Sequence, residues 1–441
     1  MPQTYYERAL VPDGSRSRLL VVSRDRPALP LWTLVDPETV ASLREARAQF
    51  GIESPFLRLV RQEGDPVGED DVLTILEFDA AGPGWQPGSS LRWLPFDDVD
   101  EEHLDAGPFG PDVVRWIAEL RSGVVPELRE EWARPGWHEA TTAWVAAELE
   151  WLGRTVEGPI EQMGSWAISS LLGVDTNRGR AIVKTVPPLY GHEPELTRAL
   201  AREHPGRVPD VLAIDPERRH LVMQGFGGAP LGSEEPARWA DGLVELAGIQ
   251  QSWIGRRDEA TRIRVEDRSL AALDRELESI VTDEMASPGL APLDRERLVA
   301  NLPRYRDYIG RLQAGPVPET LCHGDFHPWN VQRDEGRVVI YDWSDAAWGH
   351  PFFDIRTFTV RTPDEAAREA MRAAYLGAWA AFGDPDALQT AVDLAAPLSE
   401  LHVAISWRRI QAVFEPGAFP FVDGGAQRHL EMALGVTDGI D

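Results

Sequence analysis

Apolar residues recur about every 3.6 positions through the second half of the chain, the spacing that places side chains on one face of a helix. This pattern predicts helices over Pro236 to Ser252, Ser269 to Thr282, Leu293 to Gln313, Pro363 to Phe382 and Asp386 to Phe414. Short β-rich apolar runs predict strands instead, at Arg18 to Val22, Val72 to Phe78, Ala181 to Val186 and Val338 to Tyr341. The sequence therefore predicts an α+β protein whose last part is mostly helical.

Turn-rich and charged stretches divide the chain into parts. Pro and Gly residues from Gly107 to Pro111 precede a predicted helix, Asp112 to Ser122, and a charged, proline-containing segment follows from Val125 to Pro135. Such composition is typical of a connector between domains. We therefore expect an α/β domain over residues 1–124, a linker over residues 125–135 and a second domain that begins near residue 136.

The segment from Cys322 to Asp354 carries the strongest chemical signal. Asp325 closes a His-Gly-Asp triplet, Asn330 follows five residues later, and Asp342 ends the apolar run at Tyr341. The turn residues Asp334-Glu335-Gly336 lie in between, so the segment is predicted to fold as a loop, a turn and a strand that returns Asp342 beside Asp325.

This order of residues suits phosphoryl transfer. That reaction needs one carboxylate to take or orient the hydroxyl proton, and oxygen ligands for Mg²⁺ on the nucleotide. Asp325 suits the first task, whereas Asn330 and Asp342 suit the second. An ordinary polar loop followed by a strand end is the plain alternative, but it does not account for all of these features in one order.

The segment resembles the catalytic core of the aminoglycoside phosphotransferase/choline kinase-like family of small-molecule kinases. The shared motifs are His-Gly-Asp-x-x-x-x-Asn and Asp-Trp followed by Gly-x-Pro-x-x-Asp, here residues 323–330, 342–343 and 349–354. The resemblance implies that His323 shapes the loop, Asp325 is the base, Asn330 and Asp342 hold metal, and Asp354 braces the loop. Trp329 departs from the small residue that many relatives carry there.

The same resemblance implies a fold and a set of cofactors. It predicts a bilobal, protein-kinase-like fold with a mixed β N-lobe over residues 136–228 and a helical C-lobe over residues 229–441. It also predicts ATP or another NTP together with Mg²⁺ as cofactors.

Lys184 is the only lysine in the chain, since the 44 Lys and Arg residues include 43 arginines. It lies in the predicted strand Ala-Ile-Val-Lys-Thr, and a compact ammonium is not interchangeable with arginine at a phosphate. The resemblance implies that Lys184 contacts the α- and β-phosphates and pairs with a helix glutamate. Glu193 is the preferred partner because Leu196 and Leu200 share its helical face, and Glu195 is the alternative.

Two further nucleotide contacts are predicted from weaker signals. The stretch Met163 to Trp166, between predicted strands, would cover the phosphates with backbone N–H groups and the Ser165 hydroxyl, although an ordinary hairpin fits equally well. The stretch Leu221 to Gly228 is predicted as a strand that enters a glycine-rich hinge. By resemblance, its backbone near Gln224 would meet the adenine.

Composition limits the kinds of molecule that the protein is expected to bind. The net charge of −28 argues against nucleic acid and mildly favours a cationic acceptor. No apolar run approaches the ~20 residues of a membrane span, and neither a signal peptide nor an intramolecular disulfide is expected, since Cys322 is the single cysteine. We therefore expect a cytoplasmic protein of unassigned oligomeric state.

The spacing after Asp342 bears on the size of the acceptor. Gly349-His350-Pro351 follows within nine residues, which leaves little room for a peptide-binding segment. A small hydroxylated acceptor, of the aminoglycoside, amino sugar or amino alcohol type, is expected.

The first domain resembles a Nudix fold. Arg44, Glu45 and Gly51 match the motif of that family, but Ala48 and Gln49 stand where its paired metal-binding glutamates would be. The upstream positions, Pro30 and Asp36, also depart from the motif. The resemblance implies a non-hydrolytic Nudix-like module, and an unrelated α/β domain is the alternative. A nucleotide-binding pseudokinase or sensor, and a bifunctional enzyme with an active hydrolase domain, are the rival functions.

Overall fold

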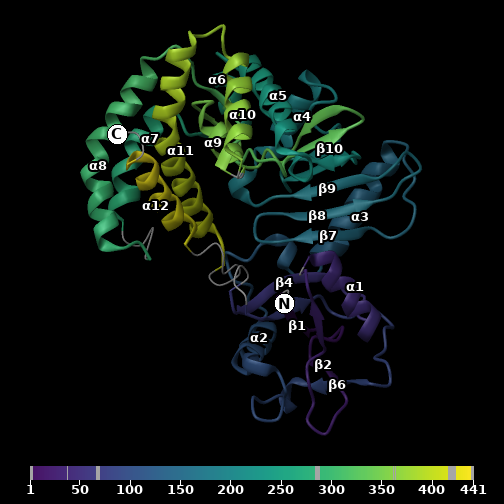
Figure 1. Ribbon diagram of the computed structural model, residues 1–441. Coiled ribbons are helices and arrows are strands. Elements are labelled where there is room, and N and C mark those ends of the chain that lie inside the picture. Colours follow the sequence, from purple (N-terminus) through teal and green to yellow (C-terminus); the bar gives the residue numbers. More distant parts are fainter. Residues whose placement is uncertain are drawn as a thin grey trace. The chain divides into compact units, whose positions relative to one another are not determined.

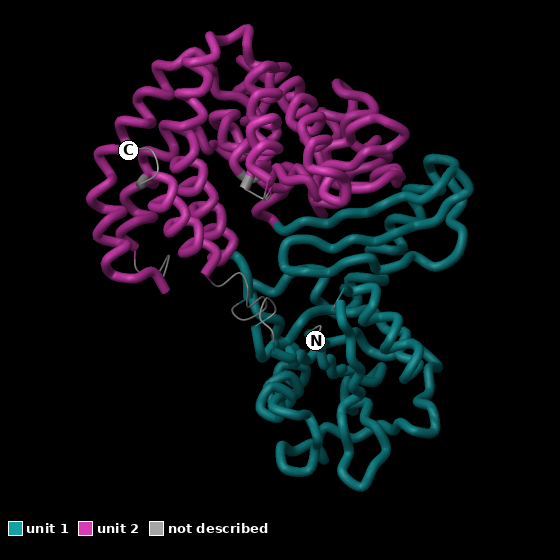
Figure 2. Tube along the Cα trace, in the orientation of Figure 1, with its two compact units in different colours: residues 1–187, 413–421 teal, residues 188–412, 422–441 magenta. Residues whose placement is uncertain are grey.

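The computed structural model describes residues 3–36, 38–65, 70–283, 289–360, 362, 364–415 and 424–438 (Figure 1). The chain forms two compact units, each described by itself below (Figure 2). The first contains residues 1–187 and 413–421, and the second contains residues 188–412 and 422–441. The elements confirm a mixed α+β protein.

The first unit begins with a four-stranded mixed sheet in the order β3-β1-β5-β4. Its central strands β1 and β5 are parallel, and both outer strands are antiparallel to their neighbours. A second, antiparallel pair joins β2 to β6. These elements, with the helices that accompany them, are β1 (Tyr5–Leu10), β2 (Arg18–Val22), β3 (Leu31–Leu34), α1 (Thr39–Phe50), β4 (Phe56–Glu63), β5 (Val72–Phe78), β6 (Leu91–Pro95) and α2 (Gly110–Ser122).

Two apolar clusters hold this part together. Trp32, Phe56 and Phe78 belong to one cluster, in which both Trp32 and Phe56 meet the Phe78 ring edge-on. Trp116 of α2 belongs to the other cluster and packs edge-on against Phe96. Both sets join strands to helices, because alternate strand residues and one face of each helix turn inward.

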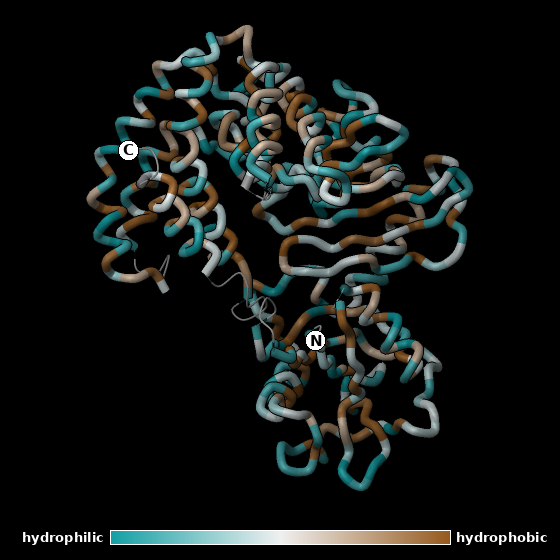
Figure 3. The backbone as a smooth tube through the Cα atoms, in the orientation of Figure 1, coloured by the Kyte–Doolittle hydropathy of each residue, from teal (hydrophilic) through white to brown (hydrophobic). Residues whose placement is uncertain are grey.

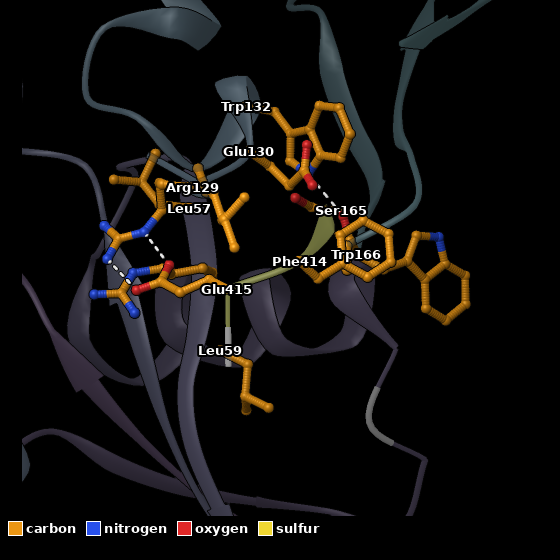
Figure 4. Close-up of a pocket in the computed structure, with 13 residues that line it drawn as sticks. Leu57, Leu59, Arg129, Glu130, Trp132, Ser165, Trp166, Phe414 and Glu415 are labelled. Atoms are coloured by element: carbon orange, nitrogen blue, oxygen red, sulfur yellow. Dashed lines mark hydrogen bonds and ion pairs between the residues drawn. The ribbon is translucent and has the colours of Figure 1, made fainter. Parts of the chain in front are cut away.

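The segment predicted as a linker is packed against the rest of the first unit. It contains a 3₁₀ turn, Glu131–Ala133, and the buried Trp132 donates its indole N–H to the carbonyl oxygen of Trp166 at 2.7 Å. The buried Arg129 donates to Glu119 at 2.8 Å and to Glu415 at 2.5 Å. Figure 4 shows the Glu415 contact, by which residues after the helix α11 (Pro385–Val413) return to this unit.

The remainder of the first unit is a helix and an antiparallel three-stranded meander. The elements are α3 (Trp137–Trp151), β7 (Glu161–Ser165), β8 (Ser170–Val174) and β9 (Ala181–Thr185). Met163 to Ser165, predicted to lie between strands, belong to β7, because Gly164 and Ser165 pair with Leu171 and Ser170. The turn therefore lies after Ser165, where the Trp166 N–H donates to the Ser169 carbonyl at 2.9 Å.

The second unit is mainly helical, with short strands that carry the loops. It opens with α4 (Glu193–Glu203), the hairpin β10 (Val211–Asp215) and β11 (His220–Gln224), and β12 (Ala229–Pro230). It continues with α5 (Ala240–Ser252), α6 (Arg257–Ile263), β13 (Glu266–Asp267), α7 (Leu270–Thr282), α8 (Pro292–Gln313), β14 (Thr320–Cys322), β15 (Val331–Asp334), β16 (Arg337–Ile340), β17 (Ala347–Gly349), α9 (Phe353–Val360), α10 (Glu365–Ala378), α11 (Pro385–Val413) and α12 (Gly425–Asp438). One large apolar cluster connects these helices, and apolar and polar positions alternate along them (Figure 3).

The predicted helices of this unit are confirmed, with differences at their ends. Pro236–Arg238 form a 3₁₀ turn, so the α-helix starts at Ala240. Pro363 lies outside the described residues. The helix α10 begins after Asp364, whose side chain accepts hydrogen bonds from the N–H groups of Ala366 and Ala367 and thereby caps the helix.

Candidate active site

A tight hairpin places Asn330 next to Asp342. Strands β15 and β16 pair from Val331 opposite Ile340 to Asp334 opposite Arg337, and Glu335 and Gly336 form the turn with φ of 48° and 83°. Two central residues with positive φ match the right-handed twist of a two-residue hairpin. At its open end the Tyr341 N–H donates to the Asn330 carbonyl at 3.1 Å. The predicted loop, turn and returning strand are therefore present.

Asp325 and Asn330 are joined by the loop between β14 and β15. The Asn330 side-chain amide N–H donates to the Asp325 carbonyl at 3.0 Å and lies 3.5 Å from Asp325 Oδ2. Because Nδ2 is engaged in this way, Oδ1 is the side-chain atom of Asn330 that suits a metal ion.

His327 sets the charge state of Asp325. Its Nε2 lies 3.3 Å from Asp325 Oδ2, and 46% of the Asp325 side chain is exposed. Burial raises the pKa of this carboxyl, but the hydrogen bond and charge of His327 outweigh that effect, and the net pKa is lowered. Asp325 is therefore ionised at neutral pH and can accept a hydrogen bond from a hydroxyl group.

Asp342 follows β16 in a left-handed conformation with φ of 64°. Residues other than glycine seldom adopt a positive φ, and such positions cluster at functional sites. The Ser344 hydroxyl donates to Asp342 Oδ1 at 2.6 Å, which orients the carboxylate. Carboxylate and amide oxygens are hard ligands of the kind that Mg²⁺ accepts together with nucleotide phosphates and water.

These donors fit a metal that also uses oxygens from the nucleotide. Among the described residues, no group of three or more His, Cys, Asp or Glu side chains could hold a metal by itself. A site built from Asn330 and Asp342 is therefore the incomplete set expected for Mg²⁺ bound through a substrate phosphate.

Asp354 holds in place the loop that carries His323 and Gly324. It accepts the N–H of His323 at 2.8 Å, the N–H of Gly324 at 2.9 Å and the side-chain amide of Gln250 at 2.9 Å. Burial raises the pKa of Asp354 to about 6, although the three hydrogen bonds oppose that shift. Gly324 is required here, since its φ is 86° and an added Cβ would lie 2.0 Å from the Asp345 carbonyl oxygen.

His323 ties the loop to the hairpin. Its Nε2 lies 3.0 Å from the Tyr341 carbonyl oxygen, which can only accept, so Nε2 carries the proton. Burial lowers the pKa of His323 to about 4. The ring is therefore neutral at pH 7 and serves as a fixed hydrogen-bond donor.

The other predicted nucleotide contacts are divided between the two units. Glu193 is 1% exposed at the start of α4, whereas Glu195 is more exposed and lies 4.0 Å from Arg198, so the inward-facing glutamate is the one preferred from the sequence. Gln224 ends β11. Lys184 is a buried residue of β9 in the first unit, and its pairing with Glu193 stays a prediction.

Ser165 also lies in the first unit, at the end of β7. Its backbone N–H donates to the Thr39 hydroxyl oxygen at 3.3 Å, so this N–H already has a partner within its own unit. Its predicted contact with the nucleotide stays a prediction.

Sequence reasoning missed several residues that support the site. His327 follows Asp325 by two positions, and this proximity was the available signal. Gln250 and Tyr375 lay beyond local signals, because they belong to distant helices. The Tyr375 hydroxyl donates to Gln250 Oε1 at 2.6 Å, and Gln250 in turn donates to Asp354.

One protein-family model matches the part of the chain that contains this hairpin. The model of the phosphotransferase enzyme family matches residues 169–389, half of the chain. The search of curated proteins finds no match.

The search of solved structures also finds kinases and phosphotransferases. An ethanolamine kinase of Plasmodium vivax is 12% identical, with a TM-score of 0.50, and the alignment covers 74% of this chain and 96% of that one. A choline/ethanolamine kinase family protein of Mesorhizobium loti is 19% identical, with a TM-score of 0.45 and coverage of 68% and 99%. A macrolide 2'-phosphotransferase of Brachybacterium faecium is 19% identical, with a TM-score of 0.42 and coverage of 62% and 98%.

Proposed function

The chain belongs to the phosphotransferase enzyme family, and on this premise we propose that it moves the γ-phosphate of ATP, or of another NTP, to a hydroxyl group of a small molecule. The observation that carries the proposal is the convergence of Asp325, Asn330 and Asp342 at the open end of one hairpin. Phosphoryl transfer depends mainly on positioning and on charge stabilisation, and this arrangement offers both.

Each residue of the hairpin has a distinct task in this reaction. Asp325, ionised beside His327, accepts the hydrogen bond of the acceptor hydroxyl and aims its oxygen at the phosphate. Asn330 Oδ1 and the Asp342 carboxylate would hold Mg²⁺, which neutralises phosphate charge when bound. His323 and Asp354 hold the loop in place through the hydrogen bonds described above.

The nucleotide contacts predicted from the sequence belong to this proposal. We assign phosphate contacts to Lys184, supported by Glu193, and to Ser165, and adenine contacts to the backbone near Gln224. The buried positions of Lys184 and Glu193 support these roles, because a buried charge is retained where it has a charged partner.

A small acceptor is favoured over a protein. The residues that follow Asp342 are packed, since β17 pairs with β14 and Trp343, Ala346 and Trp348 are buried. This stretch therefore contains no extended segment on which a peptide would lie. The charge of −28 favours a cationic acceptor, such as an aminoglycoside, amino sugar or amino alcohol.

The location of the enzyme is also part of the proposal. No described helix is both long and apolar enough to cross a membrane. The single cysteine, Cys322, is buried and suits a reducing compartment, which supports a cytoplasmic location.

The test is consumption of ATP with Mg²⁺ across a panel of hydroxylated acceptors. Acceptor-dependent turnover should be lost in Asp325→Ala and kept in Asp258→Ala, which changes an exposed aspartate of α6. Nucleotide binding without turnover on any acceptor would favour the pseudokinase or sensor instead.

The N-terminal module is proposed to be Nudix-like and non-hydrolytic. Ala48 and Gln49 occupy the positions of the paired glutamates on α1, and the Gln49 amide donates to Glu45 at 3.1 Å. Neutral side chains there are poor ligands for Mg²⁺ on a diphosphate. Release of phosphate from nucleoside diphosphates by the Asp325→Ala full chain, lost on Glu45→Gln, would establish the bifunctional alternative.

A further inference from the structure

The first unit contains a cavity of about 540 Å³ whose lining shares only Ser165 with the nucleotide contacts of the proposed function. It lies between strands β1, β4 and β5, the start of α1, and the β7–β8 hairpin. Its volume falls within the range of roughly 300–1,000 Å³ that is typical of small-molecule sites. The cavity is therefore large enough to enclose an organic ligand.

The charged groups around the cavity are all acidic. Glu7, Asp36 and Glu38 line it, and its lining among the described residues includes no Lys, Arg or His. Glu7 is 3% exposed and accepts the indole N–H of Trp32 at 2.7 Å, whereas Asp36 and Glu38 are exposed at the edge. A nucleotide or another phosphate compound would meet only like charge here, so the ligand is not an anion.

The rest of the lining is amphipathic. Phe56, Leu76 and Trp166 supply apolar surface. Ser165 and Gln62 also line the cavity, and within the described part of the chain their Oγ and Nε2 atoms are buried without a hydrogen-bond partner. Buried polar atoms are normally satisfied, so these two point to a polar group supplied from outside the chain.

We propose that this cavity binds an amphipathic organic cation, with its ammonium group near Asp36 and Glu38 and its apolar body against Phe56 and Trp166. An acceptor atom on the ligand would satisfy Gln62 Nε2 and the Ser165 hydroxyl, and this role of Ser165 is the alternative to the phosphate contact assigned above. The cavity is formed within the first unit, whereas Asp325, Asn330 and Asp342 belong to the second. It is therefore a site additional to the proposed catalytic one, and it does not depend on the identity of the phosphate acceptor.

The site can be tested with monodansylcadaverine, a fluorescent probe that joins an apolar ring system to a primary amine. Its N-acetyl derivative is the uncharged control, because acetylation removes only the positive charge. Dansyl emission, excited directly and titrated with the full-length protein, should rise and shift to the blue for the amine. The N-acetyl derivative should bind at least about fivefold more weakly, since it lacks the attraction of the two edge carboxylates.

Variants matched in charge, at the cavity and away from it, test whether the probe binds in this cavity. Asp36→Asn combined with Glu38→Gln should weaken amine binding about five- to twentyfold and leave the N-acetyl derivative unchanged. Asp25→Asn combined with Glu53→Gln makes the same change of charge at exposed residues outside the cavity, and it should bind as the wild type does. Leu59→Trp should fill the cavity and remove binding of both probes, with thermal melting used to confirm folding.

Three results would overturn the proposal. They are equal affinity for the amine and its N-acetyl derivative, wild-type affinity in the Asp36→Asn/Glu38→Gln protein, and wild-type affinity in a folded Leu59→Trp protein. The first two stand even if Leu59→Trp does not fold, because the edge carboxylates are exposed. None of these variants changes a residue assigned to phosphoryl transfer, so a failed kinase assay and a failed binding assay have separate meanings.

Discussion

The proposed catalytic site and the cavity of the first unit are built in opposite ways. The loop and hairpin residues of that site lie within one stretch, from His323 to Asp354. Many of their hydrogen bonds are made to backbone groups of the same stretch. The cavity takes its lining from positions as far apart as Tyr5 and Leu171. A site made from one contiguous segment leaves a motif in the sequence, whereas a site made by packing separate elements does not.

Replacement of Asp325 is expected to lower kcat more than any other change proposed below. Asp325→Asn keeps the shape of the side chain but removes the charge that orients the hydroxyl, so kcat should fall by about 10²–10⁴. Binding of the dansyl amine should be unchanged, because the cavity belongs to the other unit. Steady-state kinetics beside a probe titration measures both. A loss of less than about threefold would exclude Asp325 as the residue that orients the acceptor.

Asp342→Asn should come next, with kcat lowered about 10- to 100-fold at a fixed Mg²⁺ concentration. A neutral amide is a weaker ligand than a carboxylate, so the Mg²⁺ needed for half-maximal rate should rise and part of the rate should return at high Mg²⁺. Ser344→Ala, which removes only the hydroxyl that orients Asp342, should show a smaller shift in the same direction. An unchanged Mg²⁺ profile in Asp342→Asn would contradict its role as a ligand.

Gln250→Leu tests support that comes from outside the hairpin. It removes the amide that donates to Asp354 and leaves the Tyr375 hydroxyl with the Pro351 carbonyl oxygen as its acceptor. We expect kcat to fall by about tenfold, because one buried hydrogen bond of this kind is worth roughly 1–3 kcal/mol.

The pH profile separates this positioning role from a general loss of packing. The Gln250 hydrogen bond lowers the pKa of Asp354, which is about 6, so its removal should raise that pKa further. The acidic limb of the kcat profile should therefore move to higher pH. A fall in rate at all pH values with an unmoved limb would indicate that Gln250 acts through packing alone.

His350 should make the stability of the second unit depend on pH. Burial lowers its pKa to about 3, so below pH 6.5 the unfolded chain binds a proton that the folded protein does not. Stability should fall as pH drops from 6.5 toward 3, by about 2 kcal/mol at pH 5. Urea unfolding at pH 7 and pH 5 measures the difference, which His350→Phe should reduce. An equal pH dependence in both proteins would remove His350 as its source.

Changes at the edge of the cavity should alter phosphoryl transfer least. Asp36→Asn combined with Glu38→Gln should leave the basal kcat and the KM for ATP within about twofold of wild type, since exposed charges away from a site contribute little. The same protein should bind the dansyl amine poorly. A large loss of turnover in this variant would show that the two sites are coupled.

Local sequence patterns predicted much of the fold, because helices and turns depend mainly on residues that are close together in the chain. The 3.6-residue spacing gave the helices to within a few residues, as at α7, where Ser269 caps the helix that starts at Leu270. The turn at Glu335-Gly336 was indicated by Gly336, which tolerates positive φ, whereas Glu335 adopts a positive φ without being a residue that favours it. The expected gap at Met163 to Ser165 became strand instead, because pairing with β8 decides where a strand ends and no local signal records it.

Asp325, Asn330 and Asp342 could be recognised from the amino-acid sequence, since one loop and one turn of residues that are adjacent in the chain bring them together. The groups that surround these three residues are set by tertiary packing, which the local sequence does not record. Gln250 reaches Asp354 because α5 packs beside α10 and its last turn meets the start of α9. The segment after residue 124 is held to the first unit by the ion pairs of Arg129 with Glu119 and Glu415. The cavity belongs to the same class, since it is a volume left between packed elements, and a volume has no residue pattern of its own.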